Sequence, residues 1–433
     1  MIRRLKFYKI SAVEFIRKFK APAARMRVKK LYQNEIFVIS IMCLFQGIFL
    51  LYAISNLSIS YYEAEIFYEK KSLVSLIANL SCEIFGRNDY ALRVPFILIH
   101  FANAAMIYKI SKFILKRRFD RVVATALFMA LPASMSSAIL LNPAGIIVFF
   151  TLLAIYFAKS EYNIALFVLL SVCALIDRAF FMLYVGFGIW ALYTRKKELL
   201  LLCIALFSFS VIFYDVSSEG KPKGYFLDTV GVFAGAFSPL VFLFFIYTIY
   251  RIWIKEEKSL LWFIATSALC LTMLFSLRQR VPLEMMLPYC VIATPLIIRV
   301  LFNSYRVRLP KFRTFHKIAV GVTLVSLAVS YFAVIFSDVM YEAMFANKPQ
   351  RHFIYKFDVA RQLASELKNR GVKSVSCEDE RLCLRLKFYG LPSGDSAFIY
   401  ADEPEYVSDH KNSIQNIDIY KRGVRIAKFY VKI

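Results

Sequence analysis

The segment after the first long apolar run contains residue types that could carry out proton and phosphate chemistry. Residues 61–71 read Tyr-Tyr-Glu-Ala-Glu-Ile-Phe-Tyr-Glu-Lys-Lys and include Glu63, Glu65 and Lys70. If residues 62–70 form a helix, Glu63 and Lys70 share a face about two turns apart, while Glu65 points elsewhere. A carboxylate can take a proton from a hydroxyl group, and an ammonium can bind a phosphate. The pattern predicts such a site, with a merely solvated Glu as the simpler alternative.

Further cations lie beside apolar runs elsewhere in the chain. Arg278 and Arg280 lie in the short segment Ser-Leu-Arg-Gln-Arg-Val-Pro-Leu-Glu, residues 276–284. Arg93 opens the second apolar run. Arginines at such positions either bind a phosphate through charge-assisted hydrogen bonds or anchor a helix at the lipid headgroups. For Arg93, helix anchoring or pairing with an acid of the preceding loop is a further possibility.

The cysteines and histidines predict no metal site and no cofactor. Cys377 and Cys383 flank a probable turn and would form a disulfide if their compartment is oxidising. A zinc site there would need two more ligands, which are not nearby. The four histidines have no metal-ligand spacing, so a divalent metal is possible but not indicated.

The elements that position these residues must lie in a membrane. Of the 433 residues, 59% are hydrophobic and 20% are charged, and the mean hydropathy is +0.57. Soluble domains average about 45–50% apolar residues. The composition excludes an ordinary cytosolic enzyme, a disordered chain and a disulfide scaffold. We therefore expect an α-helical polytopic membrane protein.

About eleven apolar runs approach the length of roughly 17–25 residues that crosses a bilayer as a helix, although some are short. They lie near residues 36–58, 91–115, 122–141, 143–158, 163–176, 179–194, 199–215, 229–250, 259–276, 284–301 and 318–337.

The net charge of +25 predicts the orientation of these spans. With a cytoplasmic N-terminus, 28 of the 55 Lys and Arg residues fall in cytoplasmic segments and 8 in the outer connections. Basic loops are retained on the cytoplasmic side, so we expect the N-terminus inside and the C-terminus outside. The first residues are too charged for a signal peptide. They favour contact with anionic lipid, and nucleic acid is not expected as a partner.

Three domains are expected. Residues 1–35 form a basic cytoplasmic or interfacial segment, and residues 36–337 form the transmembrane domain with a first outer loop at 59–90. Within that loop, the apolar stripe of residues 73–86 is typical of an interfacial helix. Residues 338–433 form a small outer-face α/β domain, with an amphipathic helix at 356–370 capped by Gly371 and β-type runs at 372–377, 382–389, 397–400 and 424–431.

Several short motifs occur in a fixed order in and after the first outer loop. They are Glu63-Ala64, Lys70 with Leu73, Ile84-Phe85-Gly86 and the segment Tyr-Ala-Leu-Arg-Val-Pro at 90–95. Together they resemble the first-loop pattern of GT-C glycosyltransferases that use polyprenyl-phosphate sugars, such as the aminoarabinose transferases and protein O-mannosyltransferases. The chain departs from that pattern at Tyr62, which replaces an Asp, and at Asn142, which stands where a second acid is expected.

The resemblance implies an inverting transfer of a sugar from a polyprenyl-phosphate donor to a lipid, glycan or protein acceptor. The reaction would take place on the outer face of the inner membrane of a bacterium. Glu63 would be the base, with Glu65 as the second candidate. Lys70, Arg278 and Arg280 would bind the donor phosphate, and Arg93 would be a further cation near it.

Three other functions remain open at this stage. The two departures from the family's acidic positions are compatible with a catalytically silent scaffold. An outer-leaflet glycan polymerase or ligase would place its main outer loop late in the chain, whereas this chain places it first. A lipid transporter commonly has internal repeats and broken helices, and neither is clear in the sequence.

Overall fold

A computed structural model describes residues 34–214, 224–337, 339, 359–400, 414–421 and 424–432. The predicted basic segment 1–35 falls almost entirely outside these residues, as do the first residues of the predicted C-terminal domain. The described part is mainly helical, with one small sheet near the C-terminus.

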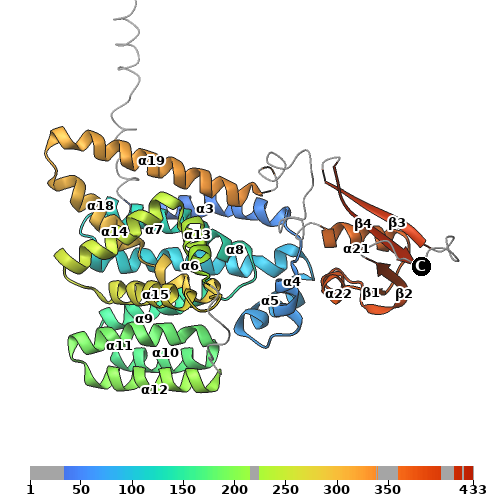
Figure 1. The fold of residues 1–433 in the computed structure, drawn as a ribbon, viewed down its shortest axis with the longest axis horizontal. Coiled ribbons are helices and arrows are strands. Elements are labelled where there is room, and N and C mark those ends of the chain that lie inside the picture. The colour runs from blue at the N-terminus through green and yellow to red at the C-terminus, as the bar shows by residue number, and fades with distance from the viewer. Residues whose placement is uncertain are drawn as a thin grey trace, which may run out of the picture.

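Long helices lie side by side and are layered from α19 at one edge of the bundle to α12 at the other (Figure 1). The bundle helices that coincide with single predicted runs are α3 (Glu35–Ser55), α6 (Asp89–Ile114), α9 (Ala144–Lys159), α10 (Asn163–Ile176), α11 (Phe181–Thr194), α12 (Lys197–Phe213), α15 (Leu260–Ser276), α18 (Thr294–Val307) and α19 (Pro310–Ile335). Shorter pieces are η1 (Arg178–Phe180), α16 (Leu283–Met286) and α17 (Pro288–Val291).

Among the described residues, four helical segments are long and apolar enough to cross a membrane, or six if each of two bent pairs counts as one span. Several other apolar helices in the bundle are shorter. Eleven spans therefore stay a prediction, although each predicted run coincides with a helix or a bent pair.

Two predicted runs do not form straight spans. Residues 229–250 break into α13 (Phe226–Phe237) and α14 (Pro239–Lys255), which are bent by 103°. The break is local, because Ser238 has a φ of +71° and Pro239 starts the second helix. Proline lacks an N–H group and is suited to the first turn of a helix, where none is needed. A milder bend of 58° separates α7 (Arg118–Ala130) from α8 (Pro132–Ile139).

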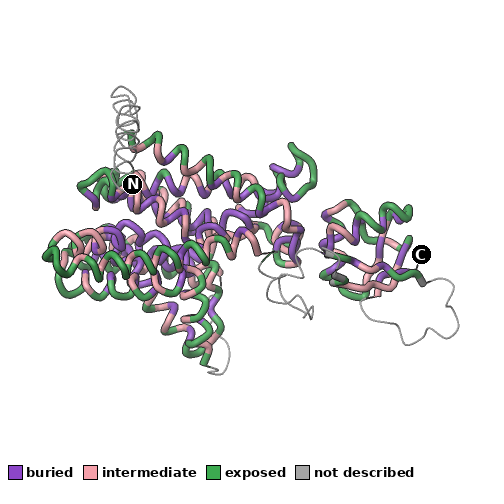
Figure 2. Tube along the Cα trace, turned by 90° about the horizontal axis from the view of Figure 1, so that it is seen from above, coloured by how far each residue is buried: buried purple, intermediate pink, exposed green. Residues whose placement is uncertain are grey.

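Burial distinguishes the bundle interior from its rim. Buried residues gather inside the bundle and, separately, inside the C-terminal domain (Figure 2). The outer helices α3 and α19 instead expose large apolar side chains such as Leu44, Phe45, Leu324 and Val325. Exposed apolar area of this size on outer helices indicates contact with lipid.

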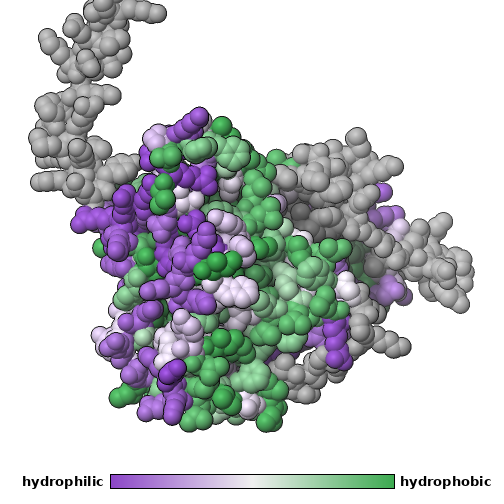
Figure 3. Space-filling view, turned by 60° about the vertical axis from the view of Figure 1, so that its left-hand side comes forward, coloured by the Kyte–Doolittle hydropathy of each residue, from purple (hydrophilic) through white to green (hydrophobic). Residues whose placement is uncertain are grey.

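Hydrophilic residues gather at one end of the bundle (Figure 3). There, Glu35 pairs with Arg118 at 3.4 Å, and Asp120 pairs with Arg306 at 2.5 Å. These ion pairs join the ends of helices that are far apart in sequence, at the end where the basic connections were predicted.

The opposite end carries α4 (Tyr61–Tyr68) and α5 (Leu73–Phe85), beside the C-terminal domain (Figure 1). Helix α5 ends at Gly86, whose φ of +81° favours glycine. Its residues Leu76, Leu80 and Ile84 are exposed. They form the apolar stripe expected of an interfacial helix.

The C-terminal domain packs two helices against a four-stranded sheet. The helices are α21 (Val359–Asn369) and α22 (Glu380–Phe388), and the strands are β1 (Val375–Cys377), β2 (Ser393–Tyr400), β3 (Ile414–Lys421) and β4 (Val424–Lys432). The strand order is β1-β2-β4-β3, with β1 parallel to β2 and the other pairs antiparallel. Gly371 follows α21 with a φ of +78°, as predicted. Strand β3 was not predicted.

The predicted β-type run at 382–389 is wrong, because these residues belong almost entirely to helix α22. The side chain of Asp379 accepts a hydrogen bond from the Arg381 backbone N–H at 3.0 Å and caps the helix. Acidic Glu380 lies in the first turn, and Arg385 and Lys387 lie in the last. This charge distribution suits the helix dipole and outweighs the alternating apolar pattern.

Candidate functional site

Glu63 lies at the start of the short helix α4 and is only 2% exposed. Its carboxylate accepts hydrogen bonds from the backbone N–H groups of Ser60 at 2.8 Å and Leu141 at 3.0 Å. Arg93 donates from Nε at 3.2 Å and from Nη2 at 2.9 Å. Each carboxylate oxygen therefore accepts two hydrogen bonds from the protein itself.

Burial alone would raise the pKa of Glu63. The charge of Arg93 and the hydrogen bonds from Arg93, Ser60 and Leu141 oppose this effect and hold the pKa below its ordinary value. The residue is thus ionised at neutral pH and joins the first loop to helix α6 and to the segment after α8. The predicted role of Glu63 as a base remains a prediction, and this geometry also provides it with a structural role.

Part of the structural role of Glu63 can be recognised in the sequence Ser-Tyr-Tyr-Glu at residues 60–63. The Ser60 hydroxyl accepts from the Glu63 N–H at 3.3 Å, while the Glu63 side chain accepts from the Ser60 N–H. This reciprocal pair is a capping box, in which a Glu three residues after a Ser starts a helix. The Ser-x-x-Glu spacing is a local signal from which the start of α4 can be predicted.

Arg93 is fully buried in α6 and points at the first loop. Beyond its two bonds to Glu63, it donates to the carbonyl oxygens of Leu57 at 2.7 Å and Ser58 at 3.1 Å. Its Nη1 lies 3.6 Å from Asp89 Oδ1. Pairing with a loop acid, one of the roles considered for Arg93, is what the structure shows. An enclosed guanidinium of this kind has no face left for a donor phosphate.

The predicted proximity of Glu63 and Lys70 is wrong, and Lys70 pairs with Glu65 at 2.9 Å instead. The reason is that α4 ends at Tyr68, so the chain turns before Lys70 and the two-turn spacing does not apply. The Lys70 side chain is 54% exposed. Its charge also acts on Glu284, a residue that the sequence analysis did not single out.

Arg278 and Arg280 follow α15 in an irregular segment, and both are exposed. Neither side chain forms a hydrogen bond or ion pair with another described residue. The same segment leads directly into α16, which carries Glu284. Glu284 therefore relates the three predicted phosphate-binding cations to one another. The charge of Lys70 acts on Glu284, and Arg278 and Arg280 lie in the segment that leads into the helix of Glu284.

A mostly apolar cavity of about 450 Å³ opens beside this region. Its walls come from α8, α9, α13, α16, α17 and the residue Val334 of α19, and Val232, Gly235 and Ala236 are the contribution of α13. The first half of the span that is bent by 103° therefore forms part of the cavity wall.

Asn142 and Glu284 also line this cavity. The Asn142 Oδ1 accepts from the Ala144 N–H at 3.0 Å, and its amide nitrogen has no partner among the described residues. Glu284 is exposed and forms no hydrogen bond or ion pair within the described chain. An apolar hollow with a few polar groups at its edge has the composition of a small-molecule site.

The C-terminal domain contacts the first loop through α22 and Tyr389. The hydroxyl of Tyr389 donates to Asp89 at 2.7 Å and accepts from the Ile59 N–H at 2.9 Å. Arg385 Nε donates to the Ile59 carbonyl oxygen at 2.8 Å, and Phe388 stacks edge-on against Phe67 at 5.5 Å. Burial lowers the pKa of Arg385 to about 10. The domain therefore holds the segment immediately before α4.

The disulfide expected between Cys377 and Cys383 is present. It joins the end of β1 to the first turn of α22. No group of three or more His, Cys, Asp and Glu residues in the described chain could hold a metal ion.

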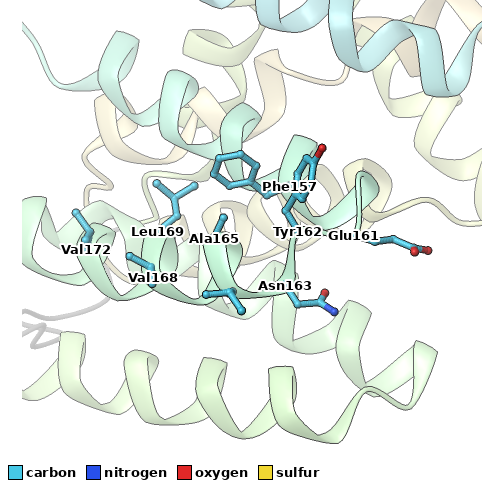
Figure 4. A pocket seen from close by; sticks show the side chains of 9 residues that line it. Phe157, Glu161, Tyr162, Asn163, Ala165, Val168, Leu169 and Val172 are labelled. Carbon is cyan, nitrogen blue, oxygen red and sulfur yellow. The ribbon is translucent and has the colours of Figure 1, made fainter.

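A larger hollow of about 810 Å³ lies on α9 and α10, lined by residues such as Phe157, Val168 and Leu169 (Figure 4). It is open and almost wholly apolar apart from Glu161 and Asn163 at one end. Its surface resembles the other lipid-facing sides of the bundle, and none of the candidate site residues lines it.

Two solved structures are similar to this chain over nearly their whole length. The crystal structure of ArnT from Cupriavidus metallidurans bound to undecaprenyl phosphate aligns with a TM-score of 0.53 and 12% identity, covering 92% of this chain and 97% of that one. This chain has a GT-C-like fold. The apo structure of the same ArnT aligns with a TM-score of 0.50 and 12% identity, covering 90% and 97%. No family model and no curated protein sequence matches this chain.

The GT-C-like fold confirms the resemblance seen in the first-loop motifs. At 12% identity the similarity concerns the fold alone.

Proposed function

We propose that this chain is a multi-pass inner-membrane glycosyltransferase that takes a sugar from a polyprenyl-phosphate donor. The acceptor is a lipid, glycan or protein at the outer face, with the N-terminus cytoplasmic and the C-terminal domain outside. The observation that carries the proposal is a mostly apolar cavity of about 450 Å³ that has the Glu284 carboxylate and the Asn142 amide in its lining. The fold similarity to ArnT bound to undecaprenyl phosphate supports it.

The division of polar and apolar surface fits a lipid phosphate. The cavity walls offer apolar side chains to an isoprenoid chain. Lys70, Arg278 and Arg280 offer positive charge to the phosphate and to the negative charge that develops as it leaves. Charged donors bind phosphate oxygens best where water is partly excluded. Glu63 and Arg93, in this proposal, hold the first loop so that Lys70 stays beside the cavity.

The test is binding of undecaprenyl phosphate to the purified protein in nanodiscs. Lys70→Ala, and the double variant Arg278→Ala with Arg280→Ala, should each weaken binding about 10- to 100-fold, since a hydrogen bond to a charged group contributes about 1.5–3 kcal/mol. Lys71→Ala is the matched control, because Lys71 is an exposed neighbour with no described partner. If the affinity is unchanged in both test variants, these cations do not bind the donor phosphate and instead anchor their segments at the lipid headgroups.

A catalytically silent scaffold is the second candidate, because Tyr62 and Asn142 occupy positions where acids were expected. Scaffold and enzyme differ in turnover. The enzyme releases undecaprenyl phosphate from a sugar-loaded donor when a membrane extract supplies acceptors, whereas a scaffold binds the lipid and releases nothing.

A further inference from the structure

Sugar transfer requires a group that takes the acceptor's hydroxyl proton, and Glu63, Glu65 and Asp89 of the first loop are already engaged. Both oxygens of Glu63 are occupied by four protein donors, and the residue is 2% exposed. Glu65 is paired with Lys70 at 2.9 Å. Asp89 accepts from Tyr389 at 2.7 Å and lies 3.3 Å from Arg361. A base needs an oxygen within hydrogen-bond reach of the substrate.

Glu284 meets that requirement. Of the described residues that line the 450 Å³ cavity, it is the one carboxylate. It is exposed and makes no hydrogen bond to the described chain, so both of its oxygens are accessible to a substrate. The positive charge of Lys70 acts on the Glu284 carboxylate and favours its ionised form.

The backbone around Glu284 restricts where its side chain can go. Pro282 precedes the four-residue helix α16, and Pro288 begins α17 directly after it. Proline fixes φ and limits the motion of both flanks. Asn142 lines the same cavity and keeps its amide nitrogen free to donate to a sugar hydroxyl. The cavity lining therefore includes a carboxylate acceptor and an amide donor, together with the serine hydroxyls of α8.

We propose that Glu284 is the general base of the transfer, an assignment that rests on the proposed function. The acceptor oxygen forms a bond to the anomeric carbon while the bond from that carbon to the phosphate oxygen breaks. The hydroxyl proton moves to the Glu284 carboxylate, and the electron pair of the broken bond remains on the phosphate beside Lys70. Glu63 is then a positioning residue of the first loop.

The test measures release of undecaprenyl phosphate from a panel of undecaprenyl-phosphate hexoses and pentoses, with a membrane extract as the source of acceptors. Glu284→Gln should lower kcat by about 10²- to 10⁴-fold, the usual contribution of a positioned base, and leave undecaprenyl phosphate affinity within about twofold. Glu83→Gln, on the exposed side of α5, is the control and should retain full activity.

Chemical rescue keeps the proposal testable if Glu284→Gln alone is ambiguous. In Glu284→Ala, added azide should occupy the vacated space, attack the anomeric carbon and yield a glycosyl azide detectable by mass spectrometry. Full kcat in Glu284→Gln, or the absence of rescue in a well-folded Glu284→Ala, would overturn the assignment. If the unaltered protein releases nothing from any donor, the proposed function itself fails and the role of Glu284 fails with it.

Discussion

Arg93 and Glu63 form a bidentate ion pair in which both side chains are almost completely enclosed, at 0% and 3% exposure. The pair links the second long helix of the bundle to the helix that starts the first outer loop. Its surroundings complete the set of partners, because Ser60 and Leu141 donate to the remaining lone pairs of the carboxylate. A buried pair satisfied in this way fixes the position of helix α4, and Lys70 lies two residues after that helix ends.

Removing one partner of this pair should destabilise the protein. Glu63→Gln removes the carboxylate that neutralises Arg93 and leaves Asp89, at 3.6 Å, as its nearest described acid, and the expected cost is about 3 kcal/mol of unfolding free energy. Glu65→Gln breaks a half-exposed pair and should cost less than about 1 kcal/mol. Thermal unfolding of both variants in the same detergent gives the comparison. A loss of activity in Glu63→Gln without any loss of stability would instead support Glu63 as the base.

The pair should also make the protein sensitive to acid. The folded-state pKa of Glu63 lies below its unfolded value of about 4.3, so the unfolded state binds more protons between the two values. The stabilisation is present above the unfolded pKa and is lost as the pH falls through the folded pKa. The melting temperature should therefore drop below about pH 4 in the unaltered protein, and that drop should be smaller in Glu63→Gln. If the melting temperature falls equally with pH in the two proteins, Glu63 is not the source of the acid sensitivity.

Filling the cavity should block the lipid. Gly235 lines the cavity wall, and a Cβ added there meets nothing within 4 Å, so Gly235→Leu is accommodated and occupies cavity space. Undecaprenyl phosphate affinity should fall about tenfold, which corresponds to about 1.4 kcal/mol. Gly231, one turn earlier on α13, is equally unobstructed but does not line the cavity, and Gly231→Leu is the matched control. Equal affinity in the two variants would place the lipid elsewhere.

The C-terminal domain should hold the first loop through the hydroxyl of Tyr389. Tyr389→Phe removes the hydrogen bonds to Asp89 and to the Ile59 N–H and should cost about 1–3 kcal/mol, because both partners lose their bond in a buried place. Hydrogen exchange of residues 58–68 should become faster in this variant. Tyr420→Phe, at a position 54% exposed, should leave that exchange unchanged. Unaltered exchange in Tyr389→Phe would show that the loop holds its position without the domain.

The disulfide should support the same contact. It closes the turn before α22, the helix that carries Arg385 and Phe388 onto the first loop. Replacing Cys377 and Cys383 together by Ser should speed exchange in both α22 and residues 58–68. The transmembrane helices should retain their protection, since they do not depend on this crosslink. If exchange becomes faster only in α22, the disulfide does not support the contact between the C-terminal domain and the first loop.

The sequence by itself determined the features that depend on composition and local pattern. Apolar runs, basic connections and first-loop motifs predicted a polytopic membrane protein with a GT-C-like fold, and the spacing of Cys377 and Cys383 predicted their disulfide. These features can be predicted because hydropathy, helix capping and short crosslinks depend on residues that are close together in the sequence. Where two local signals competed, as in α22, the capping residue Asp379 and the charges at the helix ends outweighed the alternating pattern.

Only the tertiary structure decided which distant residues meet. The seven-residue spacing predicted that Glu63 and Lys70 share one face of a helix, but the helix ends at Tyr68. Glu63 instead pairs with Arg93, 30 positions away in sequence. Glu284 and Asn142, 142 positions apart in sequence, line the same cavity because helices α8, α9, α13, α16 and α17 pack around it. Ion pairs and cavities of this kind depend on how helices pack that are far apart in the chain. A local sequence pattern does not specify which of these distant side chains come into contact.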